Sequence, residues 1–99
     1  MTIVKTIEGN TAKFTLNGKL NNTSAPELEK EIEALDDSVT ELIFDFESLS
    51  YVSSAGLRVI INVQKSANET GKRMTLTNVN EDIMEIFDMT GFINFLTIA

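Results

Sequence analysis

The chain has 99 residues, which is enough for one domain with a single hydrophobic core. It contains no cysteine, histidine or tryptophan, which excludes disulfides, thiol nucleophiles, the usual zinc sites and histidine general bases. The net charge of −7 argues against nucleic-acid binding, because that binding depends on cationic side chains. We therefore expect a single domain over residues 1–99 that binds no cofactor, metal or nucleic acid, and most familiar enzyme classes are excluded.

Membrane and export signals are not evident in the sequence. No apolar run approaches the roughly 20 residues that a membrane-spanning helix needs. Residues 1–6 lack the charged start and long apolar core of a signal peptide. An acidic chain is also repelled by anionic membrane surfaces. We expect a cytoplasmic protein without membrane contact, as a monomer or a weak dimer.

The first 35 residues predict a hairpin followed by a helix. Residues 3–7 form a weak strand pattern, and residues 8–11 are typical of a tight turn. Residues 12–16 alternate apolar and polar side chains, as a half-buried strand does. Ser24 and Glu27 have the spacing of a capping box, with Pro26 in the first turn of the helix. Leu28, Ile32 and Leu35 recur on one face of this helix.

The remaining residues alternate between strand and helix patterns. Residues 42–44 predict a strand covered on both faces. After the run Leu49–Gly56, a second helix continues to about Thr70, with Gly71 as its stop. A strand near residues 74–79, a helix capped by Asn80 that ends at Thr90 and Gly91, and a last strand at 95–98 complete the chain. The order is β-β-α-β-α-β-α-β. It predicts an α/β fold with a mixed, mostly parallel sheet and helices packed against it.

The acidic residues offer few candidates for chemistry. Glu81 and Asp82 fall in the first turn of a predicted helix, where negative charge stabilises the helix dipole, so we interpret them as structural. Asp45 stands near the carboxyl end of the predicted central strand, where open α/β sheets often place ligand-binding groups. A functional role and a role in anchoring the following loop are both open for Asp45.

Two adjacent serines, Ser53 and Ser54, stand where a loop turns into the second predicted helix. One of them is expected to be the N-cap, because serine is among the favoured cap residues. A helix N-terminus also tolerates a phosphate, because its free backbone N–H groups and its dipole favour negative charge. Phosphorylation there adds a charge of about −1.5 to −2 and so changes the surface that a binding partner contacts. The position therefore permits a phosphorylation switch without requiring one.

The segment around these serines resembles the central motif of STAS domains, in particular that of bacterial anti-sigma factor antagonists. The matching run is Asp45-Phe46-Glu47-Ser48-Leu49-Ser50-Tyr51-Val52-Ser53-Ser54-Ala55-Gly56-Leu57-Arg58-Val59. Two further elements agree in order and spacing, namely Gly18-Lys19-Leu20-Asn21 before the first helix and Thr90-Gly91-Phe92 after the last. The resemblance covers nearly the whole chain and implies a single STAS-like domain.

The resemblance implies a partner-switching regulator. In this family the unmodified domain binds an anti-sigma factor that is also a serine kinase, and so frees the sigma factor. The kinase phosphorylates the serine at the start of the second helix, and a metal-dependent serine phosphatase removes the phosphate. That serine corresponds to Ser54, with Ser53 as a less favoured target. The resemblance further implies a surface that contacts the partner, made of Asn21, Thr23, Tyr51, Ser53, Gly56, Arg58 and Asn62.

Two other functions are open. Ser53 and Asn21 stand where the family has aspartate. This difference favours an unphosphorylated STAS binding module that serves as a scaffold, a sensor or a subunit of a transport complex. A hydrolase with a serine nucleophile is the least favoured, because only lysine or a carboxylate could act as its base. Its signature would be ester hydrolysis that disappears in Ser54→Ala.

Overall fold

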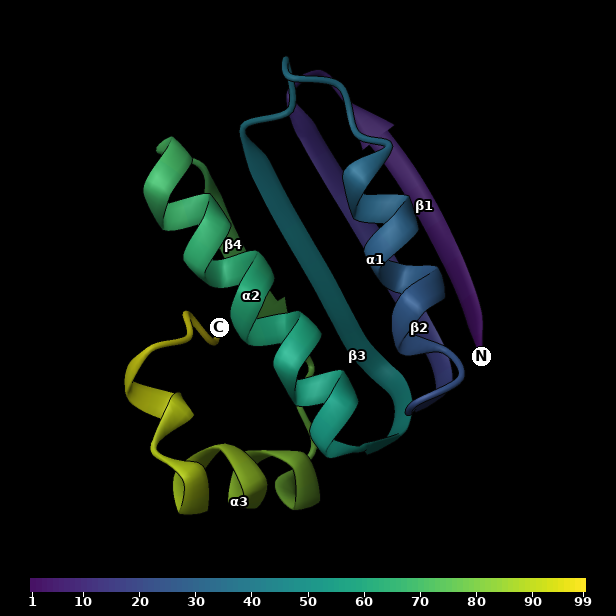
Figure 1. The fold of residues 1–99 in the computed structure, drawn as a ribbon, viewed down its shortest axis with the longest axis vertical. Helices are drawn as coiled ribbons and strands as arrows, with labels where there is room; N and C mark the ends of the chain where they lie inside the picture. Colours follow the sequence, from purple (N-terminus) through teal and green to yellow (C-terminus); the bar gives the residue numbers. More distant parts are fainter.

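The computed structural model describes residues 1–99 and has four strands, three α-helices and one short 3₁₀ helix (Figure 1). In chain order they are β1 Thr2–Glu8, β2 Thr11–Leu20, α1 Ala25–Glu33, β3 Glu41–Val52, α2 Ser54–Thr70, β4 Arg73–Thr77, α3 Glu81–Thr90 and η1 Phe92–Asn94. The strands form one sheet in the order β1-β2-β3-β4. β1 pairs with β2 antiparallel, and the other two pairings are parallel. The predicted fold class is therefore confirmed.

The helices α1 and α2 lie side by side on the same face of the sheet (Figure 1). Beneath them lie Ala12, Phe14 and Leu16 of β2 and Leu42, Phe44 and Phe46 of β3, all buried. The rings of Phe14 and Phe44 stack with their centroids 5.2 Å apart. The alternating residues of the two strands, such as Lys13 and Ile43, are exposed or half-buried, except Asp45, which is buried. The expectation that β3 is covered on both faces is wrong, because α1 and α2 cover only one.

Several of the positions where helices and strands begin or end follow directly from the sequence. Gly9 has a φ of 59° in the turn between β1 and β2, and Gly71 ends α2 with a φ of 72°. Asn80 caps α3, where its side-chain oxygen accepts a hydrogen bond from the Ile83 N–H at 2.9 Å. Glu81 and Asp82 occupy the first turn of α3, as predicted. These ends depend on local backbone preferences, which the sequence carries by itself.

Three further predicted features are wrong. β3 continues to Val52, so most of the predicted loop before α2 is strand. The last predicted strand, at residues 95–98, is reduced to a single parallel bridge between Leu76 and Ile98. The capping box at α1 does not form, because the Ser24 hydroxyl donates to the Lys19 carbonyl at 2.7 Å instead. In each case a contact with a neighbouring strand or loop competes with the local preference.

Candidate functional site

The candidate site lies where β2 and β3 end. Because these strands are parallel, their carboxyl ends meet at one edge of the sheet, with Leu20 opposite Val52 and Lys19 opposite Tyr51. α1 follows β2 and α2 follows β3, so both helices begin near this edge (Figure 1). We call the exposed or half-buried residues Asn21, Thr23, Tyr51, Ser54 and Arg58, which lie here and in the first turn or so of α2, the carboxyl-end surface.

The two serines at the start of α2 have different environments. Ser53 is the N-cap, and its side-chain oxygen accepts a hydrogen bond from the Gly56 N–H at 3.2 Å. Ser54 is the first residue of the helix; it is exposed, and its hydroxyl makes no hydrogen bond within the protein. The helix cap is therefore supplied by Ser53, and Ser54 is accessible without having a role in capping.

The start of α2 is held against the end of β2 by Leu20. The Ser53 N–H donates to the Leu20 carbonyl at 2.8 Å. Gly56 is buried one turn further, and a Cβ atom built on it would lie 2.7 Å from the Leu20 carbonyl oxygen. Gly56 was expected in the surface that contacts the partner, but it is buried, and Leu20 of the same chain fills the space beside it. Gly56 determines how closely α2 approaches β2.

Asn21 and Ser24 organise the turn between β2 and α1. The Asn21 side-chain oxygen accepts from the N–H groups of Thr23 at 3.0 Å and Ser24 at 3.2 Å. The buried Ser24 hydroxyl accepts from the Asn21 N–H at 2.9 Å. Asn21 is half-buried, while Thr23 is exposed. The acceptor oxygen of Asn21 is thus committed to the turn, and Thr23 is the more accessible of the two residues.

Tyr51 and Arg58 are the largest exposed side chains of the carboxyl-end surface. Tyr51 lies at the end of β3 with 49 % of its surface exposed. Arg58 follows Ser54 by four residues, so the two lie one turn apart on α2. The two ion pairs of the protein are Lys5–Glu31 and Lys13–Asp45, and neither involves Arg58. The Arg58 guanidinium is therefore free to meet an anionic group.

A shallow depression of about 380 Å³ runs from Ser54 along α2. Its lining residues are Ser54, Leu57, Arg58, Ile61, Asn62, Thr90 and Phe92. The site residues Arg58 and Asn62 are thus connected to Ser54 by one continuous surface. Thr90 and Phe92 were not predicted to belong to the site. The Thr90-Gly91-Phe92 element was the available signal, but only the tertiary structure places α3 and η1 beside α2.

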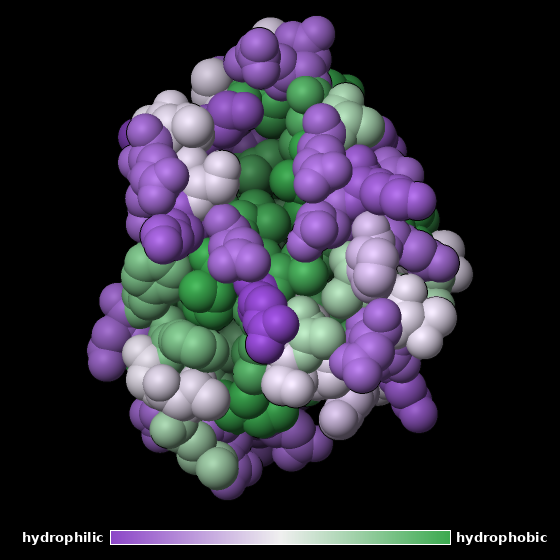
Figure 2. Space-filling view, in the orientation of Figure 1, coloured by the Kyte–Doolittle hydropathy of each residue, from purple (hydrophilic) through white to green (hydrophobic).

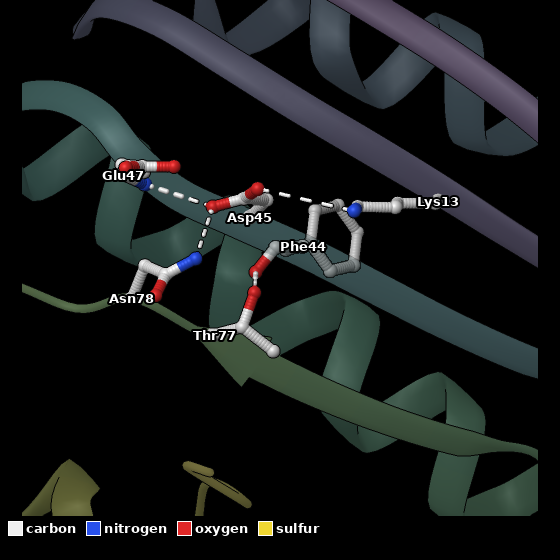
Figure 3. A network of polar contacts seen from close by, with 6 residues as sticks. All are labelled: Lys13, Phe44, Asp45, Glu47, Thr77 and Asn78. Atoms are coloured by element: carbon white, nitrogen blue, oxygen red, sulfur yellow. Dashed lines mark hydrogen bonds and ion pairs between the residues drawn. The ribbon is translucent and has the colours of Figure 1, made fainter.

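Asp45 lies in β3, seven residues before Val52 at the end of the strand, and its side chain has polar partners within the protein (Figure 3). Its carboxylate accepts from the Glu47 N–H and from the Asn78 side-chain amide, each at 3.0 Å, and lies 4.0 Å from the Lys13 ammonium. These two hydrogen bonds, chiefly that of Asn78, together with Lys13 hold the pKa of Asp45 below its ordinary value, against the opposing effect of burial. Asn78 has a φ of 56°, so Asp45 supports a left-handed turn after β4. Asp45 thus has an anchoring role, but it anchors the turn after β4 and not a loop directly after itself, because β3 continues to Val52.

The site contains neither a strongly perturbed acid–base pair nor a group of metal ligands. No cluster of three or more histidine, cysteine, aspartate or glutamate side chains is placed to hold a metal. No helix of the structure is long and apolar enough to cross a membrane. The chemical features of the site are one accessible hydroxyl at a helix N-terminus, one free guanidinium and several neutral polar side chains.

Comparison with known proteins places these features in context. The family model of the STAS domain matches residues 2–99. A candidate anti-sigma factor antagonist, BtrV of Bordetella bronchiseptica, is 32% identical over 85 residues, which are 85% of this chain and 73% of BtrV. The anti-sigma-B factor antagonist of Bacillus subtilis is 27% identical over 90 residues, 91% of this chain and 83% of that protein.

Solved structures agree with the fold. The unphosphorylated form of the anti-sigma factor antagonist SpoIIAA superimposes with a TM-score of 0.82 at 19% identity, covering 99% of this chain and 88% of SpoIIAA. The phosphorylated form of SpoIIAA from Bacillus superimposes with a TM-score of 0.80 at 20% identity, covering 99% of this chain and 91% of that one. The backbone similarity to SpoIIAA thus extends over almost the entire chain.

Proposed function

Because the chain belongs to the STAS domain family, we propose that it is an anti-sigma factor antagonist controlled by phosphorylation of Ser54. In this proposal the unmodified protein binds an anti-sigma factor with serine kinase activity. Phosphorylation of Ser54 by that kinase ends the binding, and a serine phosphatase restores it. The protein acts by binding and catalyses no reaction itself.

The observation that carries this proposal is the division of roles between the two serines. Ser53 caps α2, so its hydroxyl is engaged by the Gly56 N–H. Ser54 is exposed and makes no hydrogen bond, so a kinase can reach it without unfolding the helix. A phosphate at this position also benefits from the positive end of the helix dipole. These contacts favour Ser54 over Ser53 as the modified residue.

The partner surface that we propose comprises Asn21, Thr23, Tyr51, Arg58 and Asn62 around Ser54, with Ser53 at its edge. It is largely neutral apart from Arg58, within a protein whose net charge is −7. A phosphate placed there adds negative charge and must be desolvated on docking, which weakens binding to an apolar or acidic partner surface. Gly56 is left out of this surface because it is buried.

The binding half of the proposal is tested with the anti-sigma factor kinase of the same cells and three variants. Isothermal titration should show that Ser54→Ala binds like the wild type, whereas Ser54→Asp binds at least about tenfold more weakly. Ser38→Asp is the control, because Ser38 is exposed in the turn before β3, at the opposite end of that strand. Equal affinity of Ser54→Asp and the wild type would refute the switch.

The modification itself is tested by mass spectrometry of the protein from its own cells. The proposal predicts one phosphate, localised to Ser54, whose occupancy changes with growth conditions. A phosphate found only on Ser53 would contradict the assignment to Ser54 and make Ser53 the modified residue. If Ser54 stays unmodified under all conditions while the partner still binds, the protein is a constitutive STAS binding module instead.

A further inference from the structure

A second surface of the molecule lies between α1 and α2, on the helix face of the sheet. It is a groove of about 410 Å³. Figure 2 shows a band of hydrophobic side chains running between the two helices and flanked by hydrophilic ones. The groove has an apolar floor from α1, its following turn, β3 and α2, made of Ile32, Leu35, Leu42, Val59, Val63 and Ala67. Ser54 does not line it.

The groove is not closed by the protein's own packing. Ile32 and Leu35 belong to the apolar row of α1 and its following turn, yet both remain only half-buried. The α2 residues of the same floor, Val59, Val63 and Ala67, are buried. An apolar side chain placed in the groove would therefore remove further apolar surface of Ile32 and Leu35 from water, which is favourable.

The two rims of the groove differ in charge. The rim formed by α1 and the turn after it carries Glu29, Glu33 and Asp37, four residues apart. The α2 rim carries Asn62, Ser66 and Thr70, also four residues apart and uncharged. None of the three carboxylates takes part in an ion pair. Lys72 is the only cation that lines the groove.

We propose that this groove binds an amphipathic helix of a partner protein whose apolar face is flanked on one side by lysine or arginine. Apolar side chains of such a helix, spaced three and four residues apart, would occupy the floor between α1 and α2. Its cations would face the row of Glu29, Glu33 and Asp37, which makes no ion pair within the protein. The charge difference between the rims determines the orientation of the partner helix, because its cations are attracted to the acidic α1 rim and not to the neutral α2 rim.

The groove is separate from the switch but adjoins it. Asn62 lines both the groove and the depression that runs from Ser54. A helix in the groove would therefore lie beside the carboxyl-end surface without covering Ser54. The proposal does not depend on phosphorylation, and it is tested on the unmodified protein.

The test uses a synthetic amidated peptide of about 18 leucine and lysine residues, with the leucines on one helical face. Titration into isotopically labelled protein, followed by two-dimensional NMR, should shift the amide signals of residues such as Ile32, Val63 and Ser66. The signals of Val4 and Lys13, outside the helix face, should stay in place. A peptide with alanine in place of leucine should lose the binding, because the floor is apolar.

Matched charge variants separate the groove from general attraction to an acidic protein. Glu29→Lys combined with Glu33→Lys should weaken peptide binding about tenfold or more. The control, Glu8→Lys combined with Glu85→Lys, changes the net charge by the same amount and should change peptide affinity less than about threefold. Equal losses in the two double variants, or amide shifts spread over the outer face of the sheet, would overturn the proposal. So would binding by the alanine peptide as tight as that by the leucine peptide.

Discussion

At the scale of single residues, the start of α2 depends on two residues that perform different tasks. Ser53 satisfies a backbone N–H group of the first helical turn, and Gly56 leaves room for Leu20. The presence of a cap at this helix could be predicted from the sequence. Which of the two serines provides it could not, because the register of β3 against β2 decides where the strand ends and the helix begins.

Replacing Ser53 tests its role as a cap. Ser53→Ala should lower the free energy of unfolding by about 0.5–2 kcal/mol, because the Gly56 N–H loses its acceptor. Ser53→Asp should retain most of the stability, since aspartate is also a favoured cap and its charge suits the helix N-terminus. Urea unfolding of both variants measures this difference. A Ser53→Ala protein as stable as the wild type would contradict the assigned role.

Replacing Gly56 tests the close contact between α2 and β2. The Cβ atom of Gly56→Ala would lie 2.7 Å from the Leu20 carbonyl oxygen and 2.8 Å from the Leu20 Cγ. The backbone must shift to relieve this overlap, so we expect a loss of about 1–3 kcal/mol in unfolding free energy. Ser54→Ala, two residues earlier and exposed, should change it by less than about 0.5 kcal/mol. Similar urea midpoints for both variants would argue against the packing role.

Asp45 should make stability depend on pH. Its pKa in the folded protein is held below the ordinary value of 3.8, mainly by the hydrogen bond from Asn78. The ionised carboxylate therefore stabilises the fold above about pH 4, and this contribution is lost as the pH falls through the lowered pKa.

The test compares Asp45→Asn with the wild type at about pH 6 and about pH 3. Asparagine does not titrate, so the variant should lose less stability on acidification than the wild type does. Asp36, whose pKa is lowered by hydrogen bonds from Ser38, contributes to both proteins alike. Equal losses on acidification would show that Asp45 is not a source of the pH dependence.

At the scale of elements, α3 depends on one residue for its position as well as for its start. The Asn80 side-chain oxygen caps α3 at the Ile83 N–H, and its amide nitrogen donates to the Leu49 carbonyl of β3 at 3.1 Å. The cap follows from sequence preferences, but the bond to Leu49 requires the extension of β3 beyond its predicted end. The same extension brings α3 and η1 toward the depression beside Ser54.

Asn80→Ala should remove both the cap of α3 and the hydrogen bond to the Leu49 carbonyl of β3. We expect a loss of about 1–3 kcal/mol in unfolding free energy, because a cap and a hydrogen bond to the strand are removed together. Hydrogen exchange should accelerate most in α3. Asn80→Asp keeps the cap but not the donor to Leu49, so its loss should be intermediate. Unchanged exchange in α3 for Asn80→Ala would contradict this account.

At the scale of the whole molecule, one cluster of 21 buried hydrophobic residues joins the sheet to all three α-helices. Phe44 lies within it on the central strand β3, stacked on Phe14. Phe44→Ala should lower the unfolding free energy by about 3–5 kcal/mol, a large part of the 5–15 kcal/mol typical of a domain.

The measurement for Phe44→Ala is urea unfolding followed by circular dichroism. Val4→Ala is the control, because Val4 is 52 % exposed on the edge strand β1 and should cost far less. A comparable loss in both variants would show that the core is not organised around the Phe14–Phe44 stack.

The sequence by itself determined the order of the elements as far as α3, the buried rows of β2 and α2, the presence of caps at α2 and α3, and the motif around Ser54. These features depend on near neighbours in the chain, since periodicity, capping and turn preferences act over a few residues. Tertiary structure alone decided which serine is free, why Gly56 is required, and how Thr90 and Phe92 come beside Ser54. It also decided that the last predicted strand reduces to one bridge at Ile98, and that α1 and α2 leave a groove between them. The reason is that contacts between distant segments compete with local preferences, and their outcome depends on strand register and helix packing.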